Sequence, residues 1–311
     1  MSELLIEPSP HIRSDITTQK IMLNVLIALF PSVIAGTVIF GLRALVLVVL
    51  CAFFCVIFEY LFNLVTRRRQ TLSDLSAVVT GVLLGMNLPP TLPIYMAAIG
   101  SFAAIVIVKQ FFGGLGQNFA NPAITARIIL MLSFGRSMTS WTAPIDWAAP
   151  GTDAVSSATP LASPESLPSY LDMFLGLRAG CIGETCIAAL LIGGLYLIIR
   201  GIIDPVTPAA FIGTVAVCSI LSGHDVLMQL MSGGLVLGAF FMATDYATTP
   251  LTRAGKLIFG IGCGLITSVI RFFGVYPEGV SFSILIMNIV TPLIDRYVHQ
   301  KPFGAKKEAL K

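Results

Sequence analysis

Long apolar runs, separated by short polar segments, recur along nearly the whole sequence and constrain the fold more than any other feature. Several runs reach the roughly 20 residues that one helix needs to cross the hydrocarbon core of a bilayer. Only 11% of the 311 residues are charged, against about a quarter in an ordinary soluble domain. We therefore predict an all-α, polytopic membrane protein.

Glycine, proline and charged residues divide the chain into ten predicted spans, five on each side of a polar segment at 136–183. The predicted spans are 21–40, 44–64, 74–89, 92–109, 122–135, 184–200, 206–222, 226–243, 255–273 and 279–297. We accordingly divide the chain into a first five-helix repeat at 1–135, an extracytoplasmic loop at 136–183, a second five-helix repeat at 184–300 and a basic tail at 301–311. The first run is too long for the apolar part of a signal peptide, so we expect it to stay in the mature protein.

The distribution of Lys and Arg predicts the orientation. Most of the nineteen basic residues fall in segments that are cytoplasmic when the N-terminus is inside, as the positive-inside rule requires. Both termini are then expected in the cytoplasm, with the loop at 136–183 outside. We expect the basic run Arg67 to Arg69, and Lys306 and Lys307, to face anionic membrane lipid.

Two short patterns recur in both halves in the same order. The stretch from Gly81 to Gly85 has a counterpart from Gly234 to Gly238, and Phe111-Phe112-Gly113 is echoed by Phe272-Phe273-Gly274. These echoes predict an internal duplication, and five spans per copy would make the copies inverted. Inverted repeats commonly hold a site near the midplane between short or broken helices. We expect the third, fifth, eighth and tenth spans to be of that kind.

Few ionisable residues interrupt the apolar spans, and each is a functional candidate because charge is expensive inside a membrane. Asp245 follows the eighth span close to Thr248; this pair suits a hard monovalent cation in an ion path, the alternative being a salt bridge or helix cap. Glu59 lies late in the second span, where it can extend toward the interface near Arg67. Arg127 lies within the fifth span.

Sequence motifs for nucleotides and metals are weak. Gly113-Gly114-Leu115-Gly116 lacks the Lys-Ser/Thr of a P-loop and has no preceding strand. The six Cys and three His do not have zinc or iron–sulfur spacing, and we interpret the cysteines as packing residues. We therefore predict no metal site, no catalytic residue and no nucleic-acid partner for this chain.

The loop contains the stretch Ser156-Ser157-Ala158-Thr159-Pro160. Such residues are common in any exposed turn. The stretch also resembles the Ser-Gly-Ala-Thr type of sequence on which FMN is attached through its phosphate to a Thr hydroxyl. That sequence occurs in membrane subunits of the Rnf and Na⁺-translocating NADH:quinone oxidoreductase complexes. The resemblance implies FMN on Thr159, attached by a flavin transferase, although Ser157 stands where the pattern commonly has Gly.

The resemblance covers almost the entire chain. It includes Ser9-Pro10-His11, the stretch from Lys109 to Ala123, Gly183-Glu184-Thr185 and the stretch from Ala243 to Pro250, which look like the D subunit of Rnf complexes. The related quinone-reductase B subunit usually has a longer N-terminal segment, so we favour the Rnf D subunit. This likeness implies a multi-pass subunit of the bacterial cytoplasmic membrane that works with other membrane and peripheral subunits.

Family members are thought to hold a second, non-covalent flavin, riboflavin, within the membrane part. With Lys109, the amides of Asn118 and Asn121 are where we expect it, although either amide can simply cap the fifth helix. Gly183, Glu184 and Thr185 open the sixth predicted span. Free N–H groups at a helix start attract phosphate, while Glu184 opposes an anion and can also be a solvated residue at a helix end.

The function implied is an electron relay that couples ferredoxin and NAD⁺ chemistry on other subunits to Na⁺ or H⁺ transport. The B subunit of a Na⁺-translocating quinone reductase is the alternative within the family. Outside it, a non-redox transporter or channel fits ten spans in inverted halves equally well. A purely structural scaffold, without flavin, is a third possibility.

Overall fold

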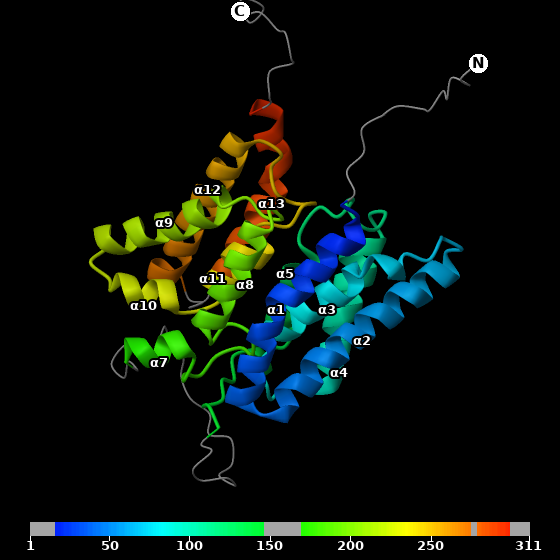
Figure 1. Ribbon diagram of the computed structural model, residues 1–311, viewed down its shortest axis with the longest axis horizontal. Coiled ribbons are helices and arrows are strands. Elements are labelled where there is room, and N and C mark those ends of the chain that lie inside the picture. Colours follow the sequence, from blue (N-terminus) through cyan, green and yellow to red (C-terminus); the bar gives the residue numbers. More distant parts are fainter. Residues whose placement is uncertain (1–15, 146–168, 275–278, 299–311) are drawn as a thin grey trace, which may run out of the picture.

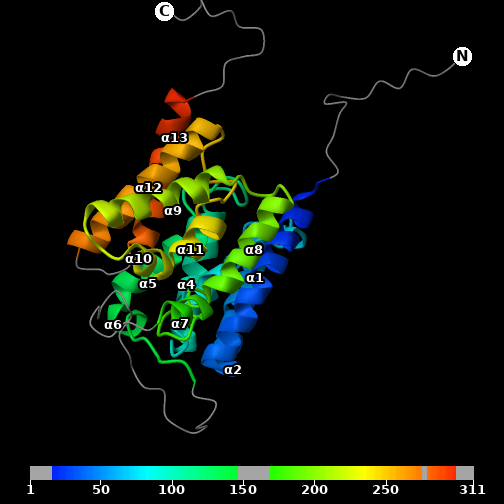
Figure 2. The same cartoon turned by 60° about the vertical axis from the view of Figure 1, so that its left-hand side comes forward.

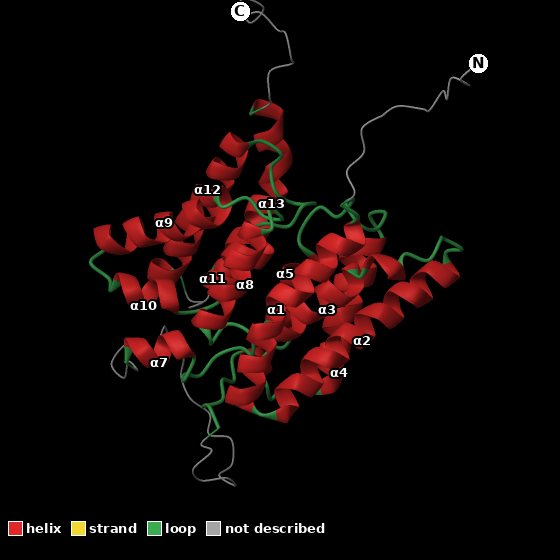
Figure 3. Cartoon of the chain, viewed as in Figure 1, coloured by secondary structure: helices red, strands yellow, loops and turns green. Residues whose placement is uncertain are grey.

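The computed structural model describes residues 16–145, 169–274 and 279–298, and every regular element in these ranges is a helix (Figure 3). The first half holds α1 (Thr18–Phe40), α2 (Leu42–Val65), η1 (Leu72–Asp74), α3 (Ser76–Met86), α4 (Ile94–Phe102), η2 (Ala103–Gln110), α5 (Pro122–Ser133) and α6 (Gly135–Met138). The second half holds α7 (Tyr170–Leu175), α8 (Ile187–Ile199), α9 (Val206–Leu221), α10 (Val226–Met231), α11 (Leu235–Leu237), η3 (Gly238–Met242), α12 (Arg253–Phe273) and α13 (Val280–Tyr297).

Several helices are suited to a membrane. Within the described ranges, α1, α2, α12 and α13 are long and apolar enough to cross one. Large apolar side chains such as Val49 and Phe53 on α2 remain exposed, as expected of a face that meets lipid. The prediction of an all-α membrane protein is confirmed. Each of the ten predicted segments contains helix, but the remaining ones are shorter, so ten complete crossings stay a prediction.

Three of the four spans expected to be short or broken are so. The helices α3 and α5 have 11 and 12 residues. The eighth segment leaves helical geometry at Ser232 and continues through α11 into η3, which has π-helical bonding. The expectation for the tenth span is wrong, because α13 is an unbroken helix of 18 residues that continues through Pro292. Next to Pro292, the hydroxyl of Thr291 bonds the carbonyls of Thr248 and Met287 and so ties this part of α13 to the segment after η3.

The two halves meet along equivalent helices (Figures 1 and 2). Across the boundary α1 packs on α8 and α5 packs on α13, while within the halves α2 packs on α4 as α9 packs on α12. A two-fold relation between the halves would produce these pairings; the inverted repeat itself stays a prediction. In both views α1 begins and α13 ends on one side of the molecule and α7 lies on the other, where Figure 2 also shows α6.

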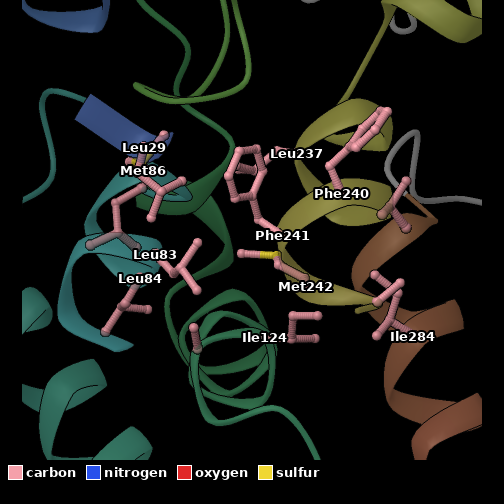
Figure 4. Packing of buried hydrophobic residues seen from close by; sticks show 14 of the residues in the cluster. Leu29, Leu83, Leu84, Met86, Ile124, Leu237, Phe240, Phe241, Met242 and Ile284 are labelled. Carbon is pink, nitrogen blue, oxygen red and sulfur yellow. The ribbon is translucent and has the colours of Figure 1, made fainter. Parts of the chain in front are cut away.

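A close helix contact and an apolar core position the central elements. A Cβ at Gly81 would lie 2.4 Å from Cα of Ala52, so glycine lets the backbones of α3 and α2 approach. Figure 4 shows Leu83 of α3, Ile124 of α5 and Phe241 of η3 converging on the same interior. The packing of this interior holds α3, α5 and η3 against one another, and the polar residues described below lie near the ends of these elements.

Candidate functional site

A cavity with about 780 Å³ of empty space, its open mouth included, lies where α1, α3, η2, α5 and the end of η3 meet. Its walls are mainly apolar, with side chains such as Val79, Leu83 and Phe241. Its polar lining residues are Ser76, Thr80, Lys109, Asn118, Asn121, Thr244, Asp245 and Tyr246. An apolar pocket with a few convergent polar groups is the usual form of a small-molecule site.

Four of the residues singled out in the sequence meet at this cavity. Lys109, Asn118 and Asn121 reach it from the first half, and Asp245 reaches it from the second. Thr248 lies beside Asp245, and its hydroxyl donates to Asp245 Oδ2 at 3.3 Å. The cavity therefore joins the proposed flavin residues to the proposed ion-path residues, which the sequence placed far apart.

Both asparagines have structural bonds as well. Asn121 is the N-cap of α5, since its Oδ1 accepts from the N–H groups of Ala123 at 3.0 Å and Ile124 at 3.3 Å. Its Nδ2 donates to the carbonyl of Met242 at 3.3 Å and so links α5 to η3. Asn118 Nδ2 donates to Ala120 O at 3.0 Å, and Asn118 and Asp245 both line the cavity. The helix-capping interpretation is thus correct for Asn121, while a role in ligand binding stays a prediction.

Lys109 forms a buried ion pair that the sequence did not indicate. Its Nζ lies 2.7 Å from Glu59 Oε2, with side chains 3% and 0% exposed, and it also donates to Ser76 Oγ at 2.6 Å. Glu59 Oε1 accepts from the hydroxyl of Thr71 at 2.6 Å. The interpretation of Glu59 as a residue extending toward the interface near Arg67 is wrong, because α2 packs on η2 and turns this carboxylate inward. The sequence offered only a weak signal for this pair: the acidic Glu59 lies late in one apolar run and the basic Lys109 lies at the end of another.

A second cavity adjoins the first and shares Thr244, Asp245 and Tyr246 with it. Asp204 lines this second cavity and lies 3.4 Å from Lys256 Nζ. Partial burial acts to raise the pKa of Asp204, but the N–H of Val206 and the charges of Lys256 and Arg253 outweigh it and lower the pKa. Asp245 is the acidic residue common to both cavities, and in the described residues neither a salt bridge nor a helix cap explains it.

A second buried ion pair lies toward the other side of the molecule. Arg127 Nη2 is 3.5 Å from Glu184 Oε1, with side chains 4% and 3% exposed. Gly183 bonds through its N–H to Met86 O at 2.8 Å, and Thr185 is buried. Helix α8 begins only at Ile187. Gly183, Glu184 and Thr185 therefore do not form the helix start that was predicted, and Glu184 is not a solvated residue, because its carboxylate turns inward to Arg127.

Two residues of this cluster were missed in the sequence. Arg127 Nη1 donates to Asn87 Oδ1 at 3.0 Å, and the thiol of Cys181 donates to Asn87 O at 3.2 Å. Cys181 also lies 3.5 Å from Arg127 Nη2, so its interpretation as simple packing was incomplete. Asn87 carried no signal beyond its place at the end of an apolar run.

The predicted FMN attachment site, Ser156, Ser157, Ala158 and Thr159, lies outside the described residues. Beyond this part of the loop, the hydroxyl of Tyr170 on α7 bonds Asp225, the N-cap of α10.

The family model described as the NQR2, RnfD, RnfE family matches residues 5–304. The chain belongs to this family. The match spans both halves and includes every residue of the cavity and of the two ion pairs.

Several curated relatives from this family are similar over nearly their whole length. The D subunit of the Na⁺-translocating ferredoxin:NAD⁺ oxidoreductase complex of Acetobacterium woodii is 50% identical, over 98% of each chain. The D subunit of the proton-translocating ferredoxin:NAD⁺ oxidoreductase complex of Clostridium ljungdahlii is 44% identical, over 97% of this chain and 96% of the relative. The D subunit of the ion-translocating oxidoreductase complex of Salmonella typhimurium is 35% identical, over 97% and 99%. The sequence-based resemblance to the Rnf D subunit is confirmed.

Proposed function

We propose that the chain is the D subunit of an ion-translocating ferredoxin:NAD⁺ oxidoreductase complex, in which it relays electrons through flavins within the membrane. The observation that carries this proposal is the 50% identity, across 98% of both chains, to a D subunit of such a complex. The other subunits of the complex are then its partners and supply the nucleotide and iron–sulfur chemistry. With the N-terminus inside, the cavity beside the start of α1 faces the cytoplasm.

The cavity is the proposed site of a non-covalent flavin such as riboflavin. Its apolar walls fit the faces of a flat ring, and Asn118 and Lys109 offer donors for the polar edge of the ring. Asn121 fixes α5 against η3 and so sets the width of the cavity at that point. A bound flavin supplies one-electron chemistry, while the protein sets its position and potential.

Asp245 and Thr248 are the proposed ion-path residues. A carboxylate beside a hydroxyl supplies the oxygen ligands that hard cations prefer, and the same carboxylate can instead carry a proton. Asp245 lies between the two cavities, so a cation bound there would sit close to a reduced ring. The relatives include one sodium-translocating and one proton-translocating complex, so the identity of the ion needs its own measurement.

The outer flavin is proposed as FMN in phosphoester linkage to Thr159, installed by a flavin transferase. The test is a denaturing gel of the chain co-produced with the transferase and viewed under ultraviolet light. We expect a fluorescent band that disappears in Thr159→Ala and persists in Thr152→Ala, a nearby Thr used as the control. A dark wild-type band would rule out this attachment and favour a non-redox transporter or a scaffold, while fluorescence that survives Thr159→Ala would mean that the flavin is attached to another residue.

A further inference from the structure

Burying the ion pair of Glu59 and Lys109 costs free energy that an apolar pair at the same positions would avoid. Burying two charges costs desolvation that their attraction often fails to recover, and apolar pairs of similar volume serve stability equally well. Ionisable groups inside membrane proteins accordingly mark functional positions. Both oxygens of Glu59 are bonded, while two of the three donors of Lys109 are used, by Glu59 and Ser76. The third hydrogen of Lys109 remains for the cavity that this residue lines.

A hydrogen-bonded chain joins this pair to the protein surface. Thr71, which is exposed, donates its hydroxyl proton to Glu59 Oε1 at 2.6 Å, and Glu59 Oε2 accepts from Lys109 at 2.7 Å. A hydroxyl can donate one proton while it accepts another. Thr71, Glu59 and Lys109 therefore form a continuous path from solvent to the cavity wall.

Several other titratable or charged groups surround the pair. On the described elements, Asp74 reaches Lys109 through Ser76, and Asp245 faces it across the cavity. Arg68 bonds the carbonyl of Gln110 next to Lys109. The thiol of Cys55 on α2 and the phenol of Tyr246 at the cavity complete the titratable set.

The ion pair is neutral as a whole, and a carboxylate already lies across the cavity from it. An electron that arrives between Lys109 and Asp245 therefore adds negative charge where a carboxylate is already present. Electrostatic interactions are strong in such a poorly solvated place. Protonating Glu59 leaves Lys109 as an unopposed cation and so balances the electron without any new buried ion.

We propose that the Glu59 and Lys109 pair is a redox-linked protonation site that takes up one proton for each electron held in the cavity. This inference rests on the proposed function, which places a flavin there, and the complex supplies the electron. As the electron arrives, the O–H bond of Thr71 breaks and an O–H bond forms on Glu59 Oε1, while Thr71 regains a proton from hydronium at the surface. Lys109 stays an ammonium ion. When the electron leaves, the O–H bond on Glu59 breaks and the proton returns to solvent.

The experiment measures the midpoint potential of the non-covalent flavin against pH in the purified complex, in a Thr159→Ala background that lacks the FMN at this position. We expect the ratio of reduced to oxidised flavin at fixed potential to change tenfold per pH unit, which is about 59 mV for one electron. Glu59→Gln keeps the shape of the side chain but cannot take up a proton, so the pH dependence should fall to what the flavin ring contributes by its own protonation. Glu59→Asp should restore it, and Ser76→Ala, which also contacts Lys109, should leave it intact.

The route is tested separately with Thr71→Val. This variant should keep the pH dependence at equilibrium and slow the uptake of protons, followed with an indicator dye after rapid reduction, by tenfold or more. A pH dependence that Glu59→Gln leaves unchanged, or its absence in the parent, would overturn the proposal. If the Thr159→Ala complex contains no flavin, the proposed flavin site in the cavity is wrong, and the inference fails with it. If a flavin is present but its pH dependence is unaffected by Glu59→Gln, only the proposed protonation site is wrong.

Discussion

The ammonium of Lys109 lies 2.7 Å from the carboxylate of Glu59, and both groups are buried between α2 and η2. This contact makes each residue depend on the other, because either charge alone would be a buried ion without a partner. It also lies on the wall of the cavity that Asn118 and Asp245 share. If the cavity holds a flavin as proposed, a change at this position should alter both stability and function.

Substituting Lys109→Met should destabilise the chain strongly, by about 3–5 kcal/mol, because it leaves the charge of Glu59 buried and unpaired. The double variant Lys109→Met with Glu59→Gln should recover much of this loss, since it removes both charges. Lys256→Met is the matched control: its pair with Asp204 is partly exposed, and such pairs contribute about 0–1 kcal/mol. Thermal unfolding of the purified complex measures all three. A double variant as unstable as the single one would show that lost packing, not lost charge, is responsible.

The two roles of Asn121 can be separated by side-chain chemistry. Asn121→Ala removes the N-cap of α5 and should cost about 0.5–2 kcal/mol. Asn121→Ser still caps the helix, so stability should be largely kept, but it loses the amide that bonds Met242 O and lines the cavity. We expect Asn121→Ser to bind the non-covalent flavin more weakly, measured as flavin retained per complex. Full retention in this variant would leave helix capping as the sole role of the residue.

The positions of the long helices were predictable from the sequence, while the pairing of buried charges was not. Apolar runs bounded by Gly and Pro locate α1, α2, α12 and α13 closely, because burial in lipid imposes one pattern along the whole helix. The meeting of Lys109 with Glu59, or of Arg127 with Glu184, depends on how α2 packs on η2 and how the 178–185 segment turns inward. Neither of these packing arrangements leaves a periodic signal in the sequence. Asn118 and Asp245 were found because they lie in motifs, but their shared cavity emerged only from the packing of the two halves.

A side chain at Gly234, just after the break in the eighth segment, should disturb the Arg127 and Glu184 pair. A Cβ there would lie 2.8 Å from Glu184 Oε2 and 3.6 Å from Arg127 Nη1, so Gly234→Ala should push the carboxylate and weaken the Arg127 pair. We expect a loss of about 1–3 kcal/mol, typical of overpacking. Gly213→Ala in α9 meets nothing within 4 Å and should instead be neutral or gain about 0.5–1 kcal/mol from higher helix propensity. Equal effects of the two substitutions on the unfolding temperature would contradict the tight contact at Gly234.

Asp245→Asn should separate electron transfer from ion transport. The amide oxygen can keep the hydrogen bond from Thr248, but the amide neither binds a cation strongly nor carries a proton. In inverted membrane vesicles supplied with reduced ferredoxin and NAD⁺, we expect NADH formation to continue while ion uptake falls at least tenfold. Uptake is followed with radioactive sodium and, in parallel, with a pH-sensitive dye, which identifies the ion in the parent. Asp225→Asn, on the far side of the molecule beside Tyr170, is the control and should transport normally. Undiminished ion uptake in Asp245→Asn would remove this residue from the path and leave the Glu59 and Lys109 pair and Tyr246 as the titratable groups on the cavity wall among the residues described.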